Sequence, residues 1–180
     1  SNVSITNIGE NGIIATGQGA SGGGNVQFIN GSRMNEIGNF SAAAGAGITA
    51  TNVGVPGGGA SILVQNSTIQ NVAEAGIRAT NSNLRVENAT LASTGDFGIE
   101  AIDGSTTFIN DTTISDVTTG VSAIANDTLS FERSATPAPA TDYKGIVNSI
   151  TIRDSFITAD TTGIALQGAI QTGGASTTPF

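Results

Sequence analysis

The stretch ILVQNSTI at residues 62–69, continued by AGIRA at 75–79, decides the fold of this chain. A second copy of the same unit follows as LRVENATL at 84–91 and FGIEA at 97–101. The first part of each copy alternates apolar and polar residues, which is typical of a strand with one buried face. A unit that recurs at this spacing and contains only strands and turns predicts a solenoid of stacked rungs.

The alternation assigns each side chain of the unit to the core or to the surface. Ile62 and Val64 are predicted to point inward, and the later step places Ile77 inside and Arg78 outside. The step of glycine followed by Ile or Val recurs along the chain, at Gly12, Gly47, Gly76, Gly98, Gly120, Gly145 and Gly163. Glycine before the strand fits either a turn with positive φ or a close approach of backbone between rungs.

This pattern resembles the right-handed parallel β-helix of the pectate-lyase-like superfamily, in a non-enzymatic form found on bacterial surfaces or secreted. The resemblance implies an all-β, single-stranded solenoid of about seven rungs with three short strands per rung. Residues 1–180 then form a single domain, and we expect it to be part of a longer chain or assembly. The family also stacks asparagines at one turn, where their amides hydrogen-bond along the axis. The corresponding row here contains Asn66, Asn88, Asp111, Arg133 and Asp154, so that a cation lies between two carboxylates.

The composition excludes several kinds of site. The chain has neither Cys nor His, so disulfides and imidazole or thiolate metal sites are excluded. Its formal net charge is −8 with 6 basic residues, which disfavours nucleic acid and insertion into or attachment to an anionic membrane. A surface of Asn, Thr, Ser and Gln suits hydrogen bonding to sugars and equally suits simple solubility, which we favour.

The most distinctive interruption of the repeat is the stretch 134–144, which contains Pro137 and Pro139. Proline cannot donate to a sheet ladder, so this stretch is predicted to leave the sheet as a loop. An aromatic ring and charges of both signs come together there, and the candidate binding residues are Glu132, Asp142, Tyr143 and Lys144. The simpler interpretation, that Tyr143 folds back to cover the edge of a rung, is the one we favour.

Catalysis would need carboxylates at equivalent outward positions of neighbouring rungs. The outward rows instead predict two ion pairs, Arg78 with Glu100 and Glu132 with Arg153. No carboxylate cluster and no His is found in these rows, so we expect no catalytic residues and no enzyme. Four acidic residues in turns (Glu74, Asp96, Asp103 and Asp116) offer calcium a weak alternative, and we expect no cofactor.

These observations favour a non-catalytic structural or adhesive segment of an exported bacterial cell-surface protein or extracellular fibre. Its expected location is extracellular or at the cell surface, and its expected partners are carbohydrate, a host or cell surface, or further copies stacked end to end. A polysaccharide lyase or glycoside hydrolase is the first alternative. A carbohydrate-binding or ice-binding surface is the second, and the ice-binding form needs a longer threonine row than Thr68, Thr90 and Thr112 or Thr113 provide.

Overall fold

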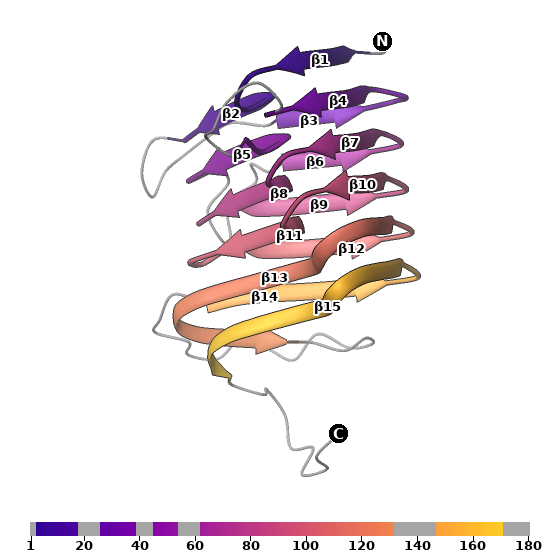
Figure 1. Ribbon diagram of the computed structural model, residues 1–180. Coiled ribbons are helices and arrows are strands. Elements are labelled where there is room, and N and C mark those ends of the chain that lie inside the picture. The colour runs from indigo at the N-terminus through magenta and orange to yellow at the C-terminus, as the bar shows by residue number, and fades with distance from the viewer. Residues whose placement is uncertain (1–2, 18–25, 39–44, 54–61, 132–146, 171–180) are drawn as a thin grey trace.

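The chain winds into a right-handed coil of strands that pair only in parallel (Figure 1). The computed structural model describes residues 3–17, 26–38, 45–53, 62–131 and 147–170, and all of the helix or strand structure in these ranges is β-strand. Each turn of the coil, called a rung here, contributes one strand to each of three ladders. The predicted all-β, right-handed parallel β-helix is therefore confirmed. Within the described ranges, no helix is long and apolar enough to cross a membrane.

The three ladders follow one another in every rung. The first ladder contains β1 (Ser4–Ile8), β4 (Arg33–Ile37), β7 (Thr68–Val72), β10 (Thr90–Thr94) and the first parts of β13 (Thr113–Phe131) and β15 (Phe156–Ile170). The second contains β2 (Ile13–Thr16), β5 (Ile48–Thr51), β8 (Ala75–Thr80), β11 (Phe97–Ile102) and the middle parts of β13 and β15. The third contains β3 (Val26–Ile29), β6 (Ile62–Gln65), β9 (Asn83–Glu87), β12 (Thr106–Asn110) and β14 (Val147–Arg153).

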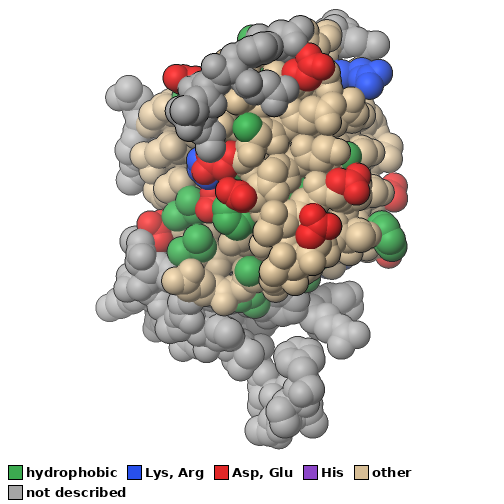
Figure 2. Space-filling view, in the orientation of Figure 1, with side chains coloured by type: hydrophobic (Ala, Val, Ile, Leu, Met, Phe, Trp, Pro, Cys, Tyr) green, Lys and Arg blue, Asp and Glu red, His purple; other side chains and the backbone are tan. Residues whose placement is uncertain are grey.

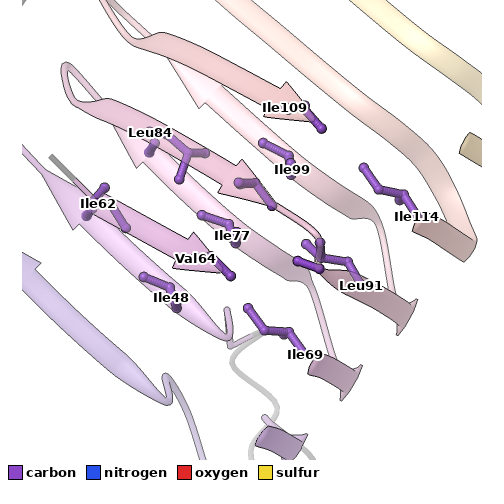
Figure 3. Close-up of a cluster of buried hydrophobic side chains, with 14 of the residues drawn as sticks. Ile48, Ile62, Val64, Ile69, Ile77, Leu84, Leu91, Ile99, Ile109 and Ile114 are labelled. Carbon is purple, nitrogen blue, oxygen red and sulfur yellow. The ribbon is translucent and has the colours of Figure 1, made fainter. Parts of the chain in front are cut away.

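The core consists of columns in which like residues stack from rung to rung. Side chains from the three ladders meet along the axis, as Figure 3 shows for ten labelled residues (Ile48, Ile62, Val64, Ile69, Ile77, Leu84, Leu91, Ile99, Ile109 and Ile114). All ten are at most 2% exposed, which confirms the inward positions predicted for Ile62, Val64 and Ile77. Because each rung buries the rung above it, the apolar core grows with the number of rungs.

The glycine column owes its identity to close packing. A Cβ built on Gly76 would lie 2.7 Å from the carbonyl oxygen of Gly98 in the next rung and 2.9 Å from Cδ2 of Leu91. None of the column's described glycines has a positive φ, whereas the described glycines that do (Gly31, Gly38 and Gly104) lie outside it. Of the two reasons offered by the sequence, the close approach between rungs is therefore the one that applies.

The turns are formed by residues in the left-handed region, which suits Asn and Asp because their short polar side chains tolerate it. Twelve of the described non-glycine residues have φ between 36° and 58°, and they fall into three columns. The column after the third ladder holds Asn30, Asn66, Asn88, Asp111 and Asp154; that within the first ladder holds Glu36, Asn71, Ser93 and Asp116; that after the second ladder holds Asn52, Asn81 and Asp103. Ten of these twelve residues are Asn or Asp, so most of these turn positions can be recognised in the sequence itself.

Near the carboxyl-terminal end, the strands of the third ladder do not follow their order in the sequence. Val121 pairs directly with Ile164, so the step at Gly145 does not lie between them; Gly145 itself is outside the described residues. The end of β13 pairs with the far side of β14, which gives the third ladder the order β12–β14–β13. The sequence pattern predicts that the strand beginning at residue 129 lies between β12 and β14 in the third ladder. In the structure, β14 lies next to β12, and the end of β13 lies on the other side of β14.

Candidate functional site

The four residues predicted to form a binding site at the proline-containing loop cannot be placed. Glu132, Asp142, Tyr143 and Lys144 lie outside the residues that the structure describes, as does the predicted ion pair of Glu132 with Arg153. Both therefore stay predictions. Two groups of described residues on the outer faces of the ladders are the remaining candidate sites.

The largest charged cluster among the described residues joins Arg78 to two glutamates. Arg78 in β8 lies opposite Glu100 in β11, and Arg78 Nε donates a hydrogen bond to Glu100 Oε2 at 2.5 Å. Glu74, in the turn before β8, accepts from Nη1 at 3.1 Å and also from Nη2 of the same guanidinium. Glu100 is only 6% exposed. The cluster therefore clamps two neighbouring rungs together at a nearly buried position.

The electrostatics of this cluster fix the protonation state of Arg78. The hydrogen bond to Glu74 is the largest cause that raises the pKa of Arg78 above the ordinary arginine value. Burial lowers that pKa, and the hydrogen bond and charge of Glu100 raise it further. A guanidinium with a raised pKa cannot accept a proton, so Arg78 is unsuited to act as a general base.

Sequence reasoning found part of this cluster. The predicted pair of Arg78 with Glu100 is confirmed, because the two residues occupy equivalent positions of successive rungs. The contribution of Glu74 was missed, because Glu74 lies four positions before Arg78 and just outside β8, where the strand alternation does not apply. The signal that could have found it is the local spacing of opposite charges.

The other turn carboxylates do not gather with Glu74 into a metal site. Asp96 is the residue next to Glu74 in the neighbouring rung, and its backbone N–H donates to the Glu74 carbonyl at 2.7 Å. Asp103 and Asp116 belong to two other turn columns. Across the part of the chain that the structure describes, no three carboxylates come close enough to hold a metal ion.

Asparagines stack at the corner after the third ladder, as the sequence predicts for Asn66 and Asn88. Asn88 Nδ2 donates to Asn66 Oδ1 at 2.6 Å, which links two rungs along the axis. The row then passes directly from Asp111 to Asp154, because the Asp111 N–H donates to the carbonyl of Arg153 at 3.2 Å. The prediction of a cation between these two aspartates is therefore wrong, and Arg133 lies outside the described residues.

A second candidate site lies on the outer face of the third ladder. The Phe108 ring in β12 has the guanidinium carbon of Arg85 at 5.3 Å from its centroid and that of Arg153 at 5.8 Å. Arg85 and Phe108 are paired in register, and Arg153 follows in β14. This group was not predicted from the sequence, because Arg133 was expected between Asp111 and Asp154, which put Arg153 one rung too far from Phe108.

The surface around these groups carries little charge. Figure 2 shows a face that is mostly uncharged polar side chains and backbone, with acidic groups scattered over it and few basic ones. Of the basic side chains in the described ranges, Arg78 and Arg85 form ion pairs, whereas Arg33 and Arg153 have no described carboxylate within ion-pair distance. The four described arginines are thus divided evenly between paired and unpaired side chains.

Together, the parallel ladders, the inward columns and the turn columns define the chain as a β-solenoid of the right-handed parallel β-helix class. Comparison with known proteins finds no matching family, no matching curated protein and no matching solved structure. The class is therefore given by the fold, and the function has to be argued from the described surface.

Proposed function

We propose that this chain is a non-catalytic structural or adhesive β-solenoid segment of an exported cell-surface protein or extracellular fibre. The observation that carries the proposal is how the outer polar residues are used. The Asn pairs at three places (Asn66 with Asn88, Asn35 with Asn71, Asn52 with Asn81) and the Arg78 cluster all bond one rung to another. Side chains committed to rung-to-rung bonds favour a rigid body that spans distance or presents a surface.

A polysaccharide lyase or hydrolase is the second candidate, and the Arg78 cluster is what favours it. Two carboxylates beside an arginine are the groups that such chemistry uses. We place it second because the Arg78 guanidinium binds both Glu74 and Glu100, so each of these carboxylates is already paired with a cation. The raised pKa of Arg78 also opposes a role in proton abstraction.

An ice-binding surface has less support. Thr68, Thr90 and Thr113 do stack in register on the outer face of the first ladder. The row is interrupted by Arg33 on one side and by Phe156 on the other. A regular lattice of threonines is therefore limited to three rungs.

End-to-end self-association is part of the proposal. The large apolar side chains that are exposed among the described residues all lie on the first and last described rungs (Val3, Ile8, Ile14, Phe156 and Ile164). Apolar side chains beside open strand edges favour addition of further strands. Light scattering over a concentration series tests this part, and a monomer at every concentration would contradict it.

The absence of catalysis is tested by incubating the protein with acidic and neutral polysaccharides, with and without calcium, and measuring new reducing ends and unsaturated products. We expect no product above the buffer control. Turnover that the substitution Glu100→Gln abolishes, in a protein that remains folded, would contradict the proposal and establish the Arg78 cluster as an active site.

A further inference from the structure

We propose that the first described rung of a second copy of this chain docks head to tail on the last described rung, in a register set by Gly163. The inference rests on the proposed end-to-end association, and it names the two edges that meet, their direction and the residues in contact. The two edges lie at opposite ends of the coil, where β1, β2 and β15 each pair with a single described strand (Figure 1).

The glycine column is the observation that points to a further rung. In this column each Cβ position faces a carbonyl oxygen of the following rung, at 2.8 Å for Gly12 with the Gly47 oxygen and at 2.6 Å for Gly120 with the Gly163 oxygen. Gly163 is the exception within the described column, because a Cβ built on it meets nothing within 4 Å. Glycine in a strand costs backbone entropy, and at this position the described chain offers no packing in return. A carbonyl oxygen of a further rung would give Gly163 the same reason as the others.

The inward columns also end uncovered at this edge. Ile164 pairs with Val121 in the second ladder, and Ile164 is 41% exposed whereas Val121 is fully buried. Ile157, which pairs with the buried Ile114 in the first ladder, is only partly buried. These side chains belong to the core, and the last described rung lacks the neighbour that buries them in every rung before it. Burial of exposed apolar surface favours addition of a further rung here.

The first described rung carries the residues that match this edge. The column that ends at Ile164 begins at Ile13, directly after Gly12. The column that ends at Ile157 begins at Ile5. When the first rung of a second copy follows the last described rung, both columns continue with isoleucine against isoleucine, and the Gly12 carbonyl faces the last glycine of the column. A second copy is therefore the occupant that fits this edge.

The direction of the join follows from the same contacts. Each Cβ position of the column meets the carbonyl of the rung on its carboxyl-terminal side, so a rung added on that side is the one that can explain Gly163. A head-to-tail contact joins two different surfaces and leaves a free edge on each copy, so that it propagates as a filament unless it closes into a ring. The six described strands of the first ladder, at about 4.8 Å each, give an axial repeat of roughly 29 Å per copy.

Two features of the edges limit the affinity of this join. On the third ladder, Ala169 and Ile170 of β15 pair with the end of β13 at the level where β3 of the second copy arrives, so the join is confined to the first and second ladders. Each copy also has a formal net charge of −8, and the exposed carboxylates of Glu10 and Asp160 lie in the two rungs that meet. Salt screens repulsion between exposed like charges. We therefore expect association to strengthen as the salt concentration rises.

The competing explanation is that Gly163 only repeats the pattern of its column and faces no further rung. Light scattering of the whole chain over a concentration series, at low and high salt, separates the two explanations. The variant is Gly163→Ala, and the matched control is Gln167→Ala, an exposed side chain of the same rung. We expect G163A to remain folded by circular dichroism and to weaken association about 10-fold or more, because its Cβ overpacks the join. Q167A should change association less than two-fold.

Single-cysteine variants report the direction and the register. Ile14 and Ala165 stand at the two ends of one outward column of the second ladder, and the natural chain contains no cysteine. In the proposed join, Ile14 of the second copy lies opposite Ala165, within the distance that a disulfide spans. Oxidation of a mixture of I14C and A165C should therefore give a mixed disulfide dimer, whereas either variant alone should stay largely monomeric.

Three outcomes would overturn the inference and leave end-to-end association standing: G163A associates as strongly as the unsubstituted chain, G163A and Q167A lose association equally, or identical cysteine variants cross-link in place of the mixed pair. A monomer at every protein and salt concentration would refute both the inference and the proposed self-association. Cleavage of a polysaccharide would contradict the non-catalytic role and would leave the scattering and cross-linking results to decide the join.

Discussion

Replacement of Gly76 by alanine tests the explanation of the glycine column directly. The added Cβ would lie 2.7 Å from the carbonyl oxygen of Gly98, 2.9 Å from Cδ2 of Leu91 and 3.2 Å from Cγ2 of Thr94. The first of these atoms belongs to the backbone of the next rung and cannot rotate away. The same substitution at Gly163, in the last described rung of the same column, meets nothing within 4 Å.

The expected magnitudes follow from these contacts. Overpacking of a close-packed interior costs about 1–3 kcal/mol, and the backbone contact places Gly76→Ala near the upper end. Alanine also restricts the unfolded chain, which stabilises by about 0.4–1 kcal/mol where the native backbone tolerates it. We therefore expect Gly76→Ala to lower the free energy of unfolding by about 2 kcal/mol, and Gly163→Ala to leave it unchanged or raise it slightly.

Urea unfolding followed by circular dichroism measures both variants against the unsubstituted chain. The comparison uses the free energy of unfolding at equal m-values, because a changed m-value would mean that the rungs no longer unfold together. If Gly76→Ala and Gly163→Ala have the same stability, the close approach between rungs does not explain the column, and the reasoning is refuted.

Three further substitutions test individual contacts by the same urea measurement. Among the described residues, Thr107 Oγ1 is a buried side-chain oxygen without a hydrogen-bond partner, so Thr107→Val should stabilise by about 1 kcal/mol. Thr112→Val should destabilise by about 1 kcal/mol, because Thr112 Oγ1 donates to the Asn110 carbonyl at 2.9 Å. Changes of the same sign in the two variants would contradict this. Asn88→Ala should cost about 1–2 kcal/mol because its φ is 46° and its amide bonds Asn66, and Asn88→Gly should recover part of that loss; an Ala variant as stable as the Gly variant would argue against the turn explanation. Glu100→Gln should cost about 1–2 kcal/mol, less than for a fully buried pair because Arg78 is partly exposed and keeps Glu74, and an unchanged stability would show that the clamp contributes nothing.

The sequence carries most of the fold because each rung repeats the same local chemistry. Alternation at Ile62 and Val64 gives the inward face, and the positive φ at Asn66 and Asn88 gives the corner. These are properties of a few neighbouring residues, so they can be predicted without knowledge of the rest of the chain. The ion pair of Arg78 with Glu100 could be predicted for the same reason, once two rungs were aligned.

The candidate site depends on information that the repeat does not contain. Arg153 reaches Phe108 only because β14 pairs directly with β12, while the end of β13 pairs on the other side of β14. The sequence 129–133 alternates like any other strand of the chain, so its pattern cannot indicate that it is placed out of turn. Strand order is a long-range property, and periodicity reports only local structure.

Oxidative cross-linking tests the order of the rungs most directly, because the natural chain contains no cysteine. Thr113 and Phe156 are exposed and paired in register on the first ladder, and the Phe156 N–H donates to the Thr112 carbonyl at 2.9 Å. We predict that the double variant T113C/F156C forms an intramolecular disulfide, since adjacent strands lie within the 4.4–6.8 Å that a disulfide spans between Cα atoms. The control T113C/A135C represents the order counted from the sequence, in which one more rung follows Thr113. Cross-linking of the control pair without cross-linking of T113C/F156C would contradict the account.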